Sequence, residues 1–373
     1  MKSNDKIMNT TLKSIVITAA IMLMAASASA QFATRNAKNV NPGQQEGFYY
    51  SVPQTVLRLD FRIEETVLLE GPYSLYADRY LGISTSNVVR GKSRQFKLVD
   101  VTINSCGEAD PEATFFVEFT HKAAKKVNVE LNNKGVLETF AVGDSPFESQ
   151  NAKVVDNAVC DNDDKPIDTS MVFKAAFVPA MGRPVEQQAR MAAEKINEIR
   201  DAKMKLLTGF QEVAFEGEAI KNMYERLDAM EEEYLSLFVG KRLTKVVVRS
   251  IYVAPTLENT ILQIAKFSLR NGLSSSLQSD GETITVTVSP SMTTASIKAP
   301  SHSAIENATH ENKLVYRIPE TANVKVTCGS RMLAEQRCSI SQLGVLLLAP
   351  IGKGQNALHF DPTTGQLTGV SRE

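Results

Sequence analysis

Two long amphipathic runs near the middle of the chain constrain the fold more than any other feature of the sequence. Both repeat apolar residues at spacings of three and four, the period of a helix that buries one face. Pro184 stands at a first-turn position before the first run, and Gly240 follows the second. Because a short connection joins the runs, they predict an antiparallel helical hairpin over residues 184–240. The repeating residues are Val185, Ala189, Ala192, Ile196, Ile199, Ala202 and Leu206, then Ile220, Met223, Leu227, Met230, Tyr234 and Leu237.

Strand patterns occupy the chain on both sides of this hairpin. Residues 57–64 alternate strictly between apolar and charged side chains, which indicates a sheet with one buried and one wet face. Short apolar runs of the same kind recur at 95–140 and again at 246–360, and a short helix is expected before Gly82. The sequence therefore predicts a β-rich α+β protein. Two antiparallel β-sandwich or barrel-like domains, at 48–180 and 241–373, flank the hairpin.

The N-terminus has the order of a secretory signal. Three lysines, Lys2, Lys6 and Lys13, precede an apolar run at 15–26 and the triplet Ala28-Ser29-Ala30. We expect residues 1–30 to be a signal peptide cleaved before Gln31, although an uncleaved anchor is the alternative. The protein is then exported, to the periplasm in the first place, with outer-membrane association or the cell surface as alternatives. The polar stretch 31–47 reads as a flexible leader.

Charge and hydropathy exclude two classes of partner. The 41 basic and 42 acidic residues nearly cancel, and no basic stripe is present, so nucleic acid is not an expected partner. No stretch after residue 30 approaches the roughly 20 apolar residues of a membrane helix, so no transmembrane segment is expected after signal cleavage.

All four cysteines lie after the expected signal peptide. An even number in an oxidising compartment predicts two disulfides, for which three pairings exist. We favour Cys106 with Cys160 and Cys328 with Cys338, since each pair falls within one expected domain. A tight turn at 329–330 would place Cys338 too far along the return strand to face Cys328, which leaves reduced cysteines as the alternative.

Two polar segments contain the strongest candidates for a metal site. Asp161, Asp163, Asp164 and Asp168 supply hard oxygen ligands suited to calcium, although Lys165 breaks the pattern of an EF-hand loop. His302 and His310 share a second polar stretch with two glutamates, but their spacing matches no zinc motif. A solvated acidic loop and exposed histidines are the competing readings.

No catalytic motif is present in the sequence. We find neither the nucleophile elbow nor the serine–lysine pattern of hydrolases, and no glycine-rich phosphate loop. Two convergent carboxylates could still cleave a glycosidic bond, but the absence of tryptophan argues against a sugar-stacking site. The sequence therefore predicts no catalytic residues and no cofactor, and it favours a non-enzymatic protein.

Several segments resemble an uncharacterised exported family of Bacteroides-type bacteria. They are Tyr50-Ser-Val-Pro-Gln-Thr-Val-Leu-Arg-Leu, Gly71-Pro-Tyr-Ser-Leu-Tyr-Ala-Asp-Arg-Tyr-Leu-Gly82, Leu206-Leu-Thr-Gly209, Leu235-Ser-Leu-Phe-Val-Gly240 and Phe360-Asp-Pro-Thr-Thr-Gly-Gln-Leu367. This resemblance to a domain of unknown function covers residues 48–370. It implies the export and the architecture described above, and it assigns no site residues.

Two functions lead at this point, and an enzyme of unrecognised type stays open as a third. The first is a structural or interaction protein of the cell envelope, in which the hairpin offers a long contact surface to an envelope protein or to a second copy of the chain. The alternative is a ligand-binding module for a glycan, a peptide or calcium, which would use the two polar segments.

Overall fold

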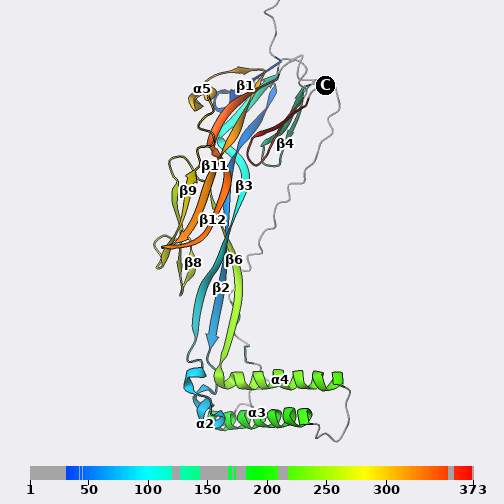
Figure 1. Ribbon diagram of the computed structural model, residues 1–373, viewed down its shortest axis with the longest axis vertical. Coiled ribbons are helices and arrows are strands. Elements are labelled where there is room, and N and C mark those ends of the chain that lie inside the picture. The colour runs from blue at the N-terminus through cyan, green and yellow to red at the C-terminus, as the bar shows by residue number, and fades with distance from the viewer. Residues whose placement is uncertain are drawn as a thin grey trace, which may run out of the picture.

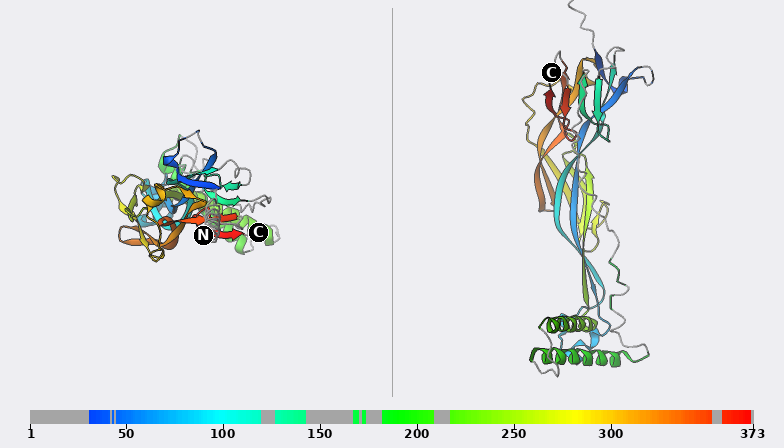
Figure 2. Two further views of the ribbon diagram at one scale, coloured as in Figure 1. Left: turned by 90° about the horizontal axis from the view of Figure 1, so that it is seen from above. Right: turned by 90° about the vertical axis from the view of Figure 1, so that its right-hand side faces the viewer.

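The computed structural model describes residues 31–41, 43, 45–119, 127–142, 167–169, 172–173, 182–208, 217–351 and 357–371. The molecule is elongated, with three open antiparallel sheets toward one end and a helical hairpin at the other (Figures 1 and 2). The expected β-rich α+β class is confirmed, and the sheets are not closed into barrels.

The first sheet is built on two very long antiparallel strands, β2 (Gly47–Leu69) and β3 (Ser93–Phe119). β6 (Lys241–Val253) pairs with the far side of β2. β1 (Phe32–Asn36) pairs with β3 and with the short β10 (His310–Glu311). At about 3.3 Å per residue, the 23 residues of β2 extend roughly 70 Å. These strands therefore set the length of the molecule.

The second sheet has the order β12-β11-β9-β7-β8. Its strands are β7 (Ile261–Ser268), β8 (Gly272–Ser274), β9 (Glu282–Pro290), β11 (Lys313–Cys328) and β12 (Arg331–Pro350). Its inner face packs on the inner face of β2 and β3, so that the two sheets form a sandwich. That core includes Leu59, Phe61, Ile103, Ile284, Val286, Val324, Val326 and Ile340.

The third sheet, in the order β14-β13-β5-β4, closes a second core at the end away from the helices. Its strands are β4 (Val127–Leu131), β5 (Leu137–Val142), β13 (Ala357–Phe360) and β14 (Leu367–Ser371). The second core joins all three sheets through Phe32, Tyr50, Phe115, Phe140, Leu314, Leu346, Leu358 and Phe360.

In two of the sheets, a strand that precedes the helical hairpin in the sequence pairs with a strand that follows it. β6 follows the hairpin yet pairs with β2, which precedes it, and β13 likewise pairs with β5. These pairings join strands from the two expected β-rich units into common sheets. Local sequence patterns carry no information about partners this distant, since a period of two identifies a strand and not its neighbour.

The expectation of a flexible leader at 31–47 is wrong in its first part. Phe32–Asn36 forms β1, and Phe32 is 1% exposed in the second core. The side chains of Thr34 and Asn36 are buried as well. The residues that face the core are one apolar residue, Phe32, and two polar ones, Thr34 and Asn36. This pattern is too short and too polar to distinguish a strand from a loop in the sequence.

A buried ion pair links the first two sheets. Arg317 on β11 donates from Nη2 to Asp110 Oδ2 at 2.9 Å and from Nη1 to the carbonyl of Pro53 at 2.9 Å. Both charged side chains are nearly sealed from solvent. Burial lowers the pKa of Arg317, partly offset by the carboxylate of Asp110. This pair ties β11 of the second sheet to β2 and β3 of the first.

Near the helices the first sheet narrows to three strands. We call this part the stalk, and it comprises residues 62–69 of β2, 93–100 of β3 and 241–249 of β6. Figure 1 shows the helical hairpin lying across the end of the stalk, with its far end projecting to one side. The helices are α2 (Ala77–Leu81), α3 (Val185–Thr208), α4 (Gly217–Val239) and α5 (His302–Glu306), with 3-10 turns η1 (Ala37–Asn39), η2 (Ser74–Tyr76) and η3 (Thr85–Asn87).

Candidate functional site: the helical hairpin

The hairpin is anchored to the stalk at its base. The ring of Tyr73, from the connection between β2 and β3, lies 5.6 Å from the ring of Phe238 at the end of α4. The Tyr73 backbone N–H donates to the carbonyl of Leu237 at 2.8 Å, and its hydroxyl donates to Gln188 on α3 at 3.1 Å. One buried tyrosine therefore fixes both helices to the stalk.

Small residues bring α3 close to this anchor. Ala189, Ala192 and Ala193 are buried together with Ile196, in a core shared with Val88, Leu237 and Phe238. Gly240 makes the turn from α4 into β6 at φ 90°, a left-handed conformation that favours glycine. Because the turn is this tight, the last residues of α4 and the first of β6 are fixed together, and α4 crosses the end of the stalk.

A charged seam joins the two helices beyond the base. Lys203 on α3 donates to Asp228 Oδ1 at 2.6 Å and to Glu231 Oε2 at 2.7 Å on α4, and Arg200 also donates to Glu231 at 2.7 Å. Burial acts to lower the pKa of Lys203, but the two hydrogen-bonded carboxylates outweigh it and raise that pKa. These pairs run in opposite directions along the helices, which confirms the antiparallel hairpin.

This seam was not expected from the sequence, although one residue indicates it. Lys203 is seven residues after Ile196 and thus continues the apolar face of α3, and a lysine on such a face signals a partner acid on the facing helix. Glu231 begins a run of three glutamates, a pattern that is typical of a solvated helix face. Its carboxylate instead accepts two hydrogen bonds, which lower its pKa against the opposing effect of burial.

The outer half of the hairpin, residues 200–208 and 217–231, is exposed over most of its surface. Lys203 is its only buried residue among those described. Met204 is 61% exposed and Leu207 67%, and Met230 on α4 is 40% exposed. Ile220, Met223 and Leu227 are half-buried at the same end of the pair. The apolar faces of both helices therefore continue beyond the part that the rest of the described chain covers.

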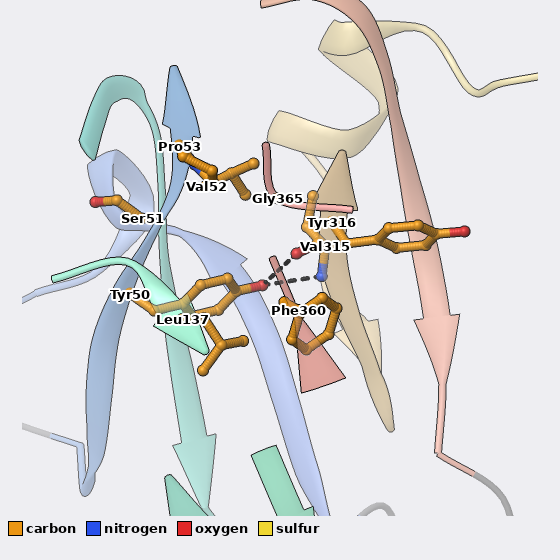
Figure 3. A pocket seen from close by; sticks show the side chains of 9 residues that line it. All are labelled: Tyr50, Ser51, Val52, Pro53, Leu137, Val315, Tyr316, Phe360 and Gly365. Carbon is orange, nitrogen blue, oxygen red and sulfur yellow. Dashed lines mark hydrogen bonds between the residues drawn. The ribbon is translucent and has the colours of Figure 1, made fainter. Parts of the chain in front are cut away.

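A small hollow lies between β2, β5, β11 and β13 (Figure 3). The space open to the centre of a water molecule is about 10 Å³, room for one water at most. The Tyr50 hydroxyl points into it, accepting from the Val315 N–H at 2.9 Å and donating to the Val315 carbonyl at 3.1 Å. Burial raises the pKa of Tyr50 above its usual range. These bonds fasten β2 to β11, and the hollow is too small for a substrate.

The acidic metal candidates fall mostly outside the described residues. Asp161, Asp163 and Asp164 are among the residues not described, and only Asp168 is placed. Its neighbour Thr169 accepts a hydrogen bond from Lys92 at 3.1 Å, beside the stalk. Among the described residues, no group of three or more histidine, cysteine, aspartate or glutamate side chains could hold a metal ion.

The two histidines of the second polar segment, His302 and His310, make different contacts. His302 lies 3.3 Å from Glu306 on the exposed face of the short α5. His310 is buried on β10, and its Nε2 lies 2.9 Å from the carbonyl of Ile305. The structure thus separates these histidines into a surface pair and a packing contact.

The predicted pairing of Cys328 with Cys338 is wrong. Gly329 turns the chain at φ 55°, and Cys328 then pairs with Arg331 while Cys338 pairs with Ala322. Cys338 therefore lies opposite a residue six positions before Cys328 on β11, beyond disulfide reach. Burial and the neighbouring Glu282 carboxylate raise the pKa of the Cys328 thiol to about 11, so this thiol is a poor nucleophile.

The predicted pairing of Cys106 with Cys160 lies partly outside the described residues. Cys106 is free on β3, half-buried, and opposite Val56 of β2. Cys160 lies outside the described residues.

A buried glutamate fixes the loop after β9. Both oxygens of Glu320 accept hydrogen bonds, Oε1 from the backbone and hydroxyl of Thr293 at 2.7 Å each and Oε2 from those of Thr294 at 3.0 and 2.6 Å. Burial opposes ionisation, but these four donors prevail and lower the pKa of Glu320 to about 2. The carboxylate thus holds the loop through hydrogen bonds to both of its oxygens, and these oxygens are not open to a ligand.

Glu320→Gln should destabilise the fold by about 2 kcal/mol at neutral pH. The side chain of glutamine has one accepting oxygen, whereas the carboxylate of Glu320 accepts hydrogen bonds with two. A lowered native pKa stabilises the fold above the unfolded value of 4.5, and that stability is lost as pH falls toward 2. Denaturant unfolding across this window should show a steeper decline for the parent than for the variant. Parallel declines would contradict the assigned role of Glu320.

The fold and the site define an elongated β-rich protein with a helical hairpin at one end. The chain belongs to the family described as a domain of unknown function, DUF4831, which matches residues 46–368. No curated protein and no solved structure shows significant similarity to it. Among the described helices, none is both long and apolar enough to cross a membrane.

Proposed function

We propose that this protein is a non-enzymatic interaction protein of the bacterial cell envelope, which uses the outer half of its helical hairpin to bind another protein. The observation that carries the proposal is the exposure of Met204, Leu207 and Met230 on helices that are rigidly anchored at their base. Exposed apolar side chains gathered on one element are typical of protein-binding surfaces. The signal-peptide pattern of residues 1–30 supports the assignment to the envelope.

The architecture suits such a role. The anchor at Tyr73 fixes the base of the hairpin, and the charged seam at Lys203 fixes the two helices against each other. A partner that lies on the outer half thus meets a preformed surface, which reduces the ordering cost of binding. Helical pairs commonly bind a third helix in this way, through residues spaced three and four apart.

Replacing Met204, Leu207 and Met230 by serine should abolish the interaction and leave folding intact. All three are exposed, so the free energy of unfolding should change by about 0.5 kcal/mol per site or less. A tagged copy in cells that normally make the protein, chemically cross-linked and purified, should recover its partner at least tenfold less efficiently than the parent chain.

The matched control replaces Leu257, Leu269 and Leu277 by serine, since these are equally exposed leucines outside the hairpin. This variant should recover the partner as the parent chain does. Equal recovery by both variants would place the binding surface elsewhere. If sedimentation shows that the parent chain self-associates and the hairpin variant does not, the bound protein is a second copy rather than a different partner.

A further inference from the structure

The stalk carries an excess of positive charge. Its three strand segments hold seven basic side chains against three carboxylates, an excess of four positive charges in a chain whose total charge is only −1. The basic side chains are Arg62, Arg94, Lys97, Lys241, Arg242, Lys245 and Arg249, and the carboxylates are Glu64, Glu65 and Asp100. A patch of one sign favours a partner of the opposite sign.

The carboxylates of the stalk are already engaged in part. Glu65 bonds Arg94 at 2.7 Å, and Asp100 lies 3.4 Å from Arg62. Glu233 at the end of α4 lies 2.7 Å from Lys241 and offsets one further charge. Beside these pairs, the stalk presents exposed basic side chains at Arg242 on β6 and Lys97 on β3.

The same strand has an open edge. β6 is the last strand of the first sheet, so one of its edges pairs with none of the described strands. The other edge pairs with β2 at all 13 positions, without a bulge. Proteins usually protect such edges with proline, bulges, short strands or charged side chains. β6 has no proline and no bulge in its pairing with β2, and its lysines and arginines are its protection, which acts against basic segments and not against acidic ones. Figure 1 shows β6 running beside β2 up the stalk.

An open edge offers backbone donors and acceptors at alternate residues, and these bind an extended segment as an added strand. The side chains then select which segment binds. Arg242 is exposed, Val246 is 53% exposed and Tyr252 62%, so β6 presents both cationic and apolar groups. A basic segment, such as β6 of a second copy, would place its basic side chains against those of this β6, which is unfavourable.

We propose that the open edge of β6 binds an extended acidic segment of a partner protein by strand addition. The segment pairs with β6 through its backbone, and its carboxylates face the basic side chains of the stalk. This surface is separate from the outer half of the hairpin, and the inference deepens the proposed function by naming the chemistry of a second contact. The two contacts are tested by different variants.

The direct probe is a fluorescein-labelled peptide as long as β6, 13 residues, that alternates valine and glutamate. The full mature chain should bind it, as measured by fluorescence anisotropy, and added salt should weaken the binding. The same peptide N-methylated at alternate residues keeps its charge but loses one row of backbone donors. It should bind at least about tenfold more weakly. Equal affinity of the two peptides would show that charge alone attracts them and would overturn strand addition.

The double variant Lys97→Glu/Arg242→Glu tests the charge of the stalk. Both side chains are exposed, so the fold should be retained and peptide affinity should fall by at least about tenfold. The matched control, Lys298→Glu/Lys313→Glu, makes the same change in charge at exposed lysines away from the stalk and should bind as the parent does. If the two variants bind alike, the stalk is not the site.

Hydrogen exchange locates the bound peptide. Saturation with the acidic peptide should slow exchange of β6 amides, and protection of another strand without β6 would overturn the assignment. The serine variant of the hairpin separates this inference from the proposed function. It should lose the cross-linked partner but bind the peptide normally, whereas the stalk variant should lose the peptide. Failure of the peptide to bind the parent chain contradicts the stalk inference alone.

Discussion

Arg317→Met should destabilise the protein by about 3–5 kcal/mol, the largest loss that we expect from any single side chain. The substitution removes the guanidinium that bonds Asp110 and Pro53, and it leaves a carboxylate buried without its countercharge. Urea unfolding followed by circular dichroism measures the loss. The reason for the size of the effect is the desolvation of an unpaired charge, not the strength of the original bond.

A double-mutant cycle with Asp110→Leu distinguishes these two explanations. Removing both charges leaves no unpaired ion, so the double variant should recover much of the loss, although Glu112 and Pro53 each lose a partner. Simply additive losses would contradict the explanation. The control is Lys38→Met, which breaks an exposed ion pair with Glu112 and should leave the free energy of unfolding nearly unchanged.

Gly344→Ala should destabilise the fold by about 3 kcal/mol or more. A Cβ at Gly344 would lie 1.9 Å from the carbonyl oxygen of Ile318 and 2.8 Å from the nitrogen of Glu320, and both are backbone atoms of the adjacent strand. The pairing of β11 with β12 shifts register at this point, and the backbones of the two strands lie close together there. Thermal unfolding should show a large drop in Tm.

The control is another strand glycine, Gly369 on β14. A Cβ there would meet only the His359 ring, at an ordinary contact distance of 3.5 Å. Gly369→Ala should therefore change stability by about 0.5 kcal/mol or less. Similar losses for both variants would indicate that the general propensity of alanine in strands, and not the close approach of two backbones, decides the outcome.

The helical part of the fold was predictable because its signal is local. A repeat of three and four over 20 residues identifies a helix wherever its partner lies, and both α3 and α4 end within two residues of the expected positions. The turn at Asn132, which joins β4 to β5, was predictable for the same reason. The side-chain Oδ1 of Asn132 accepts hydrogen bonds from the backbone N–H groups of Lys134 and Val136. Both bonds lie within the turn itself.

The strand order was not predictable, because it depends on residues far apart in sequence. The partner of Arg317 is 207 residues away, so a basic residue in an apolar strand could not be assigned a countercharge from the sequence. The open edge of β6 has the same origin, since only the complete sheet shows which strand is last. The exposed outer half of the hairpin was missed because periodicity reports the apolar face of a helix and not the length over which that face is covered.

The pairing of β1 with β10 and of β5 with β13 has a consequence for how the chain acquires its structure. Ala33 pairs with Glu311, and Ala141 pairs with Ala357, so the first and third sheets are completed only by residues near the C-terminus. Contacts of such long sequence separation make folding slow, since large loops must close before the sheets are stabilised. The third sheet, whose strand β14 ends at Ser371, is therefore completed only when synthesis of the chain is nearly finished.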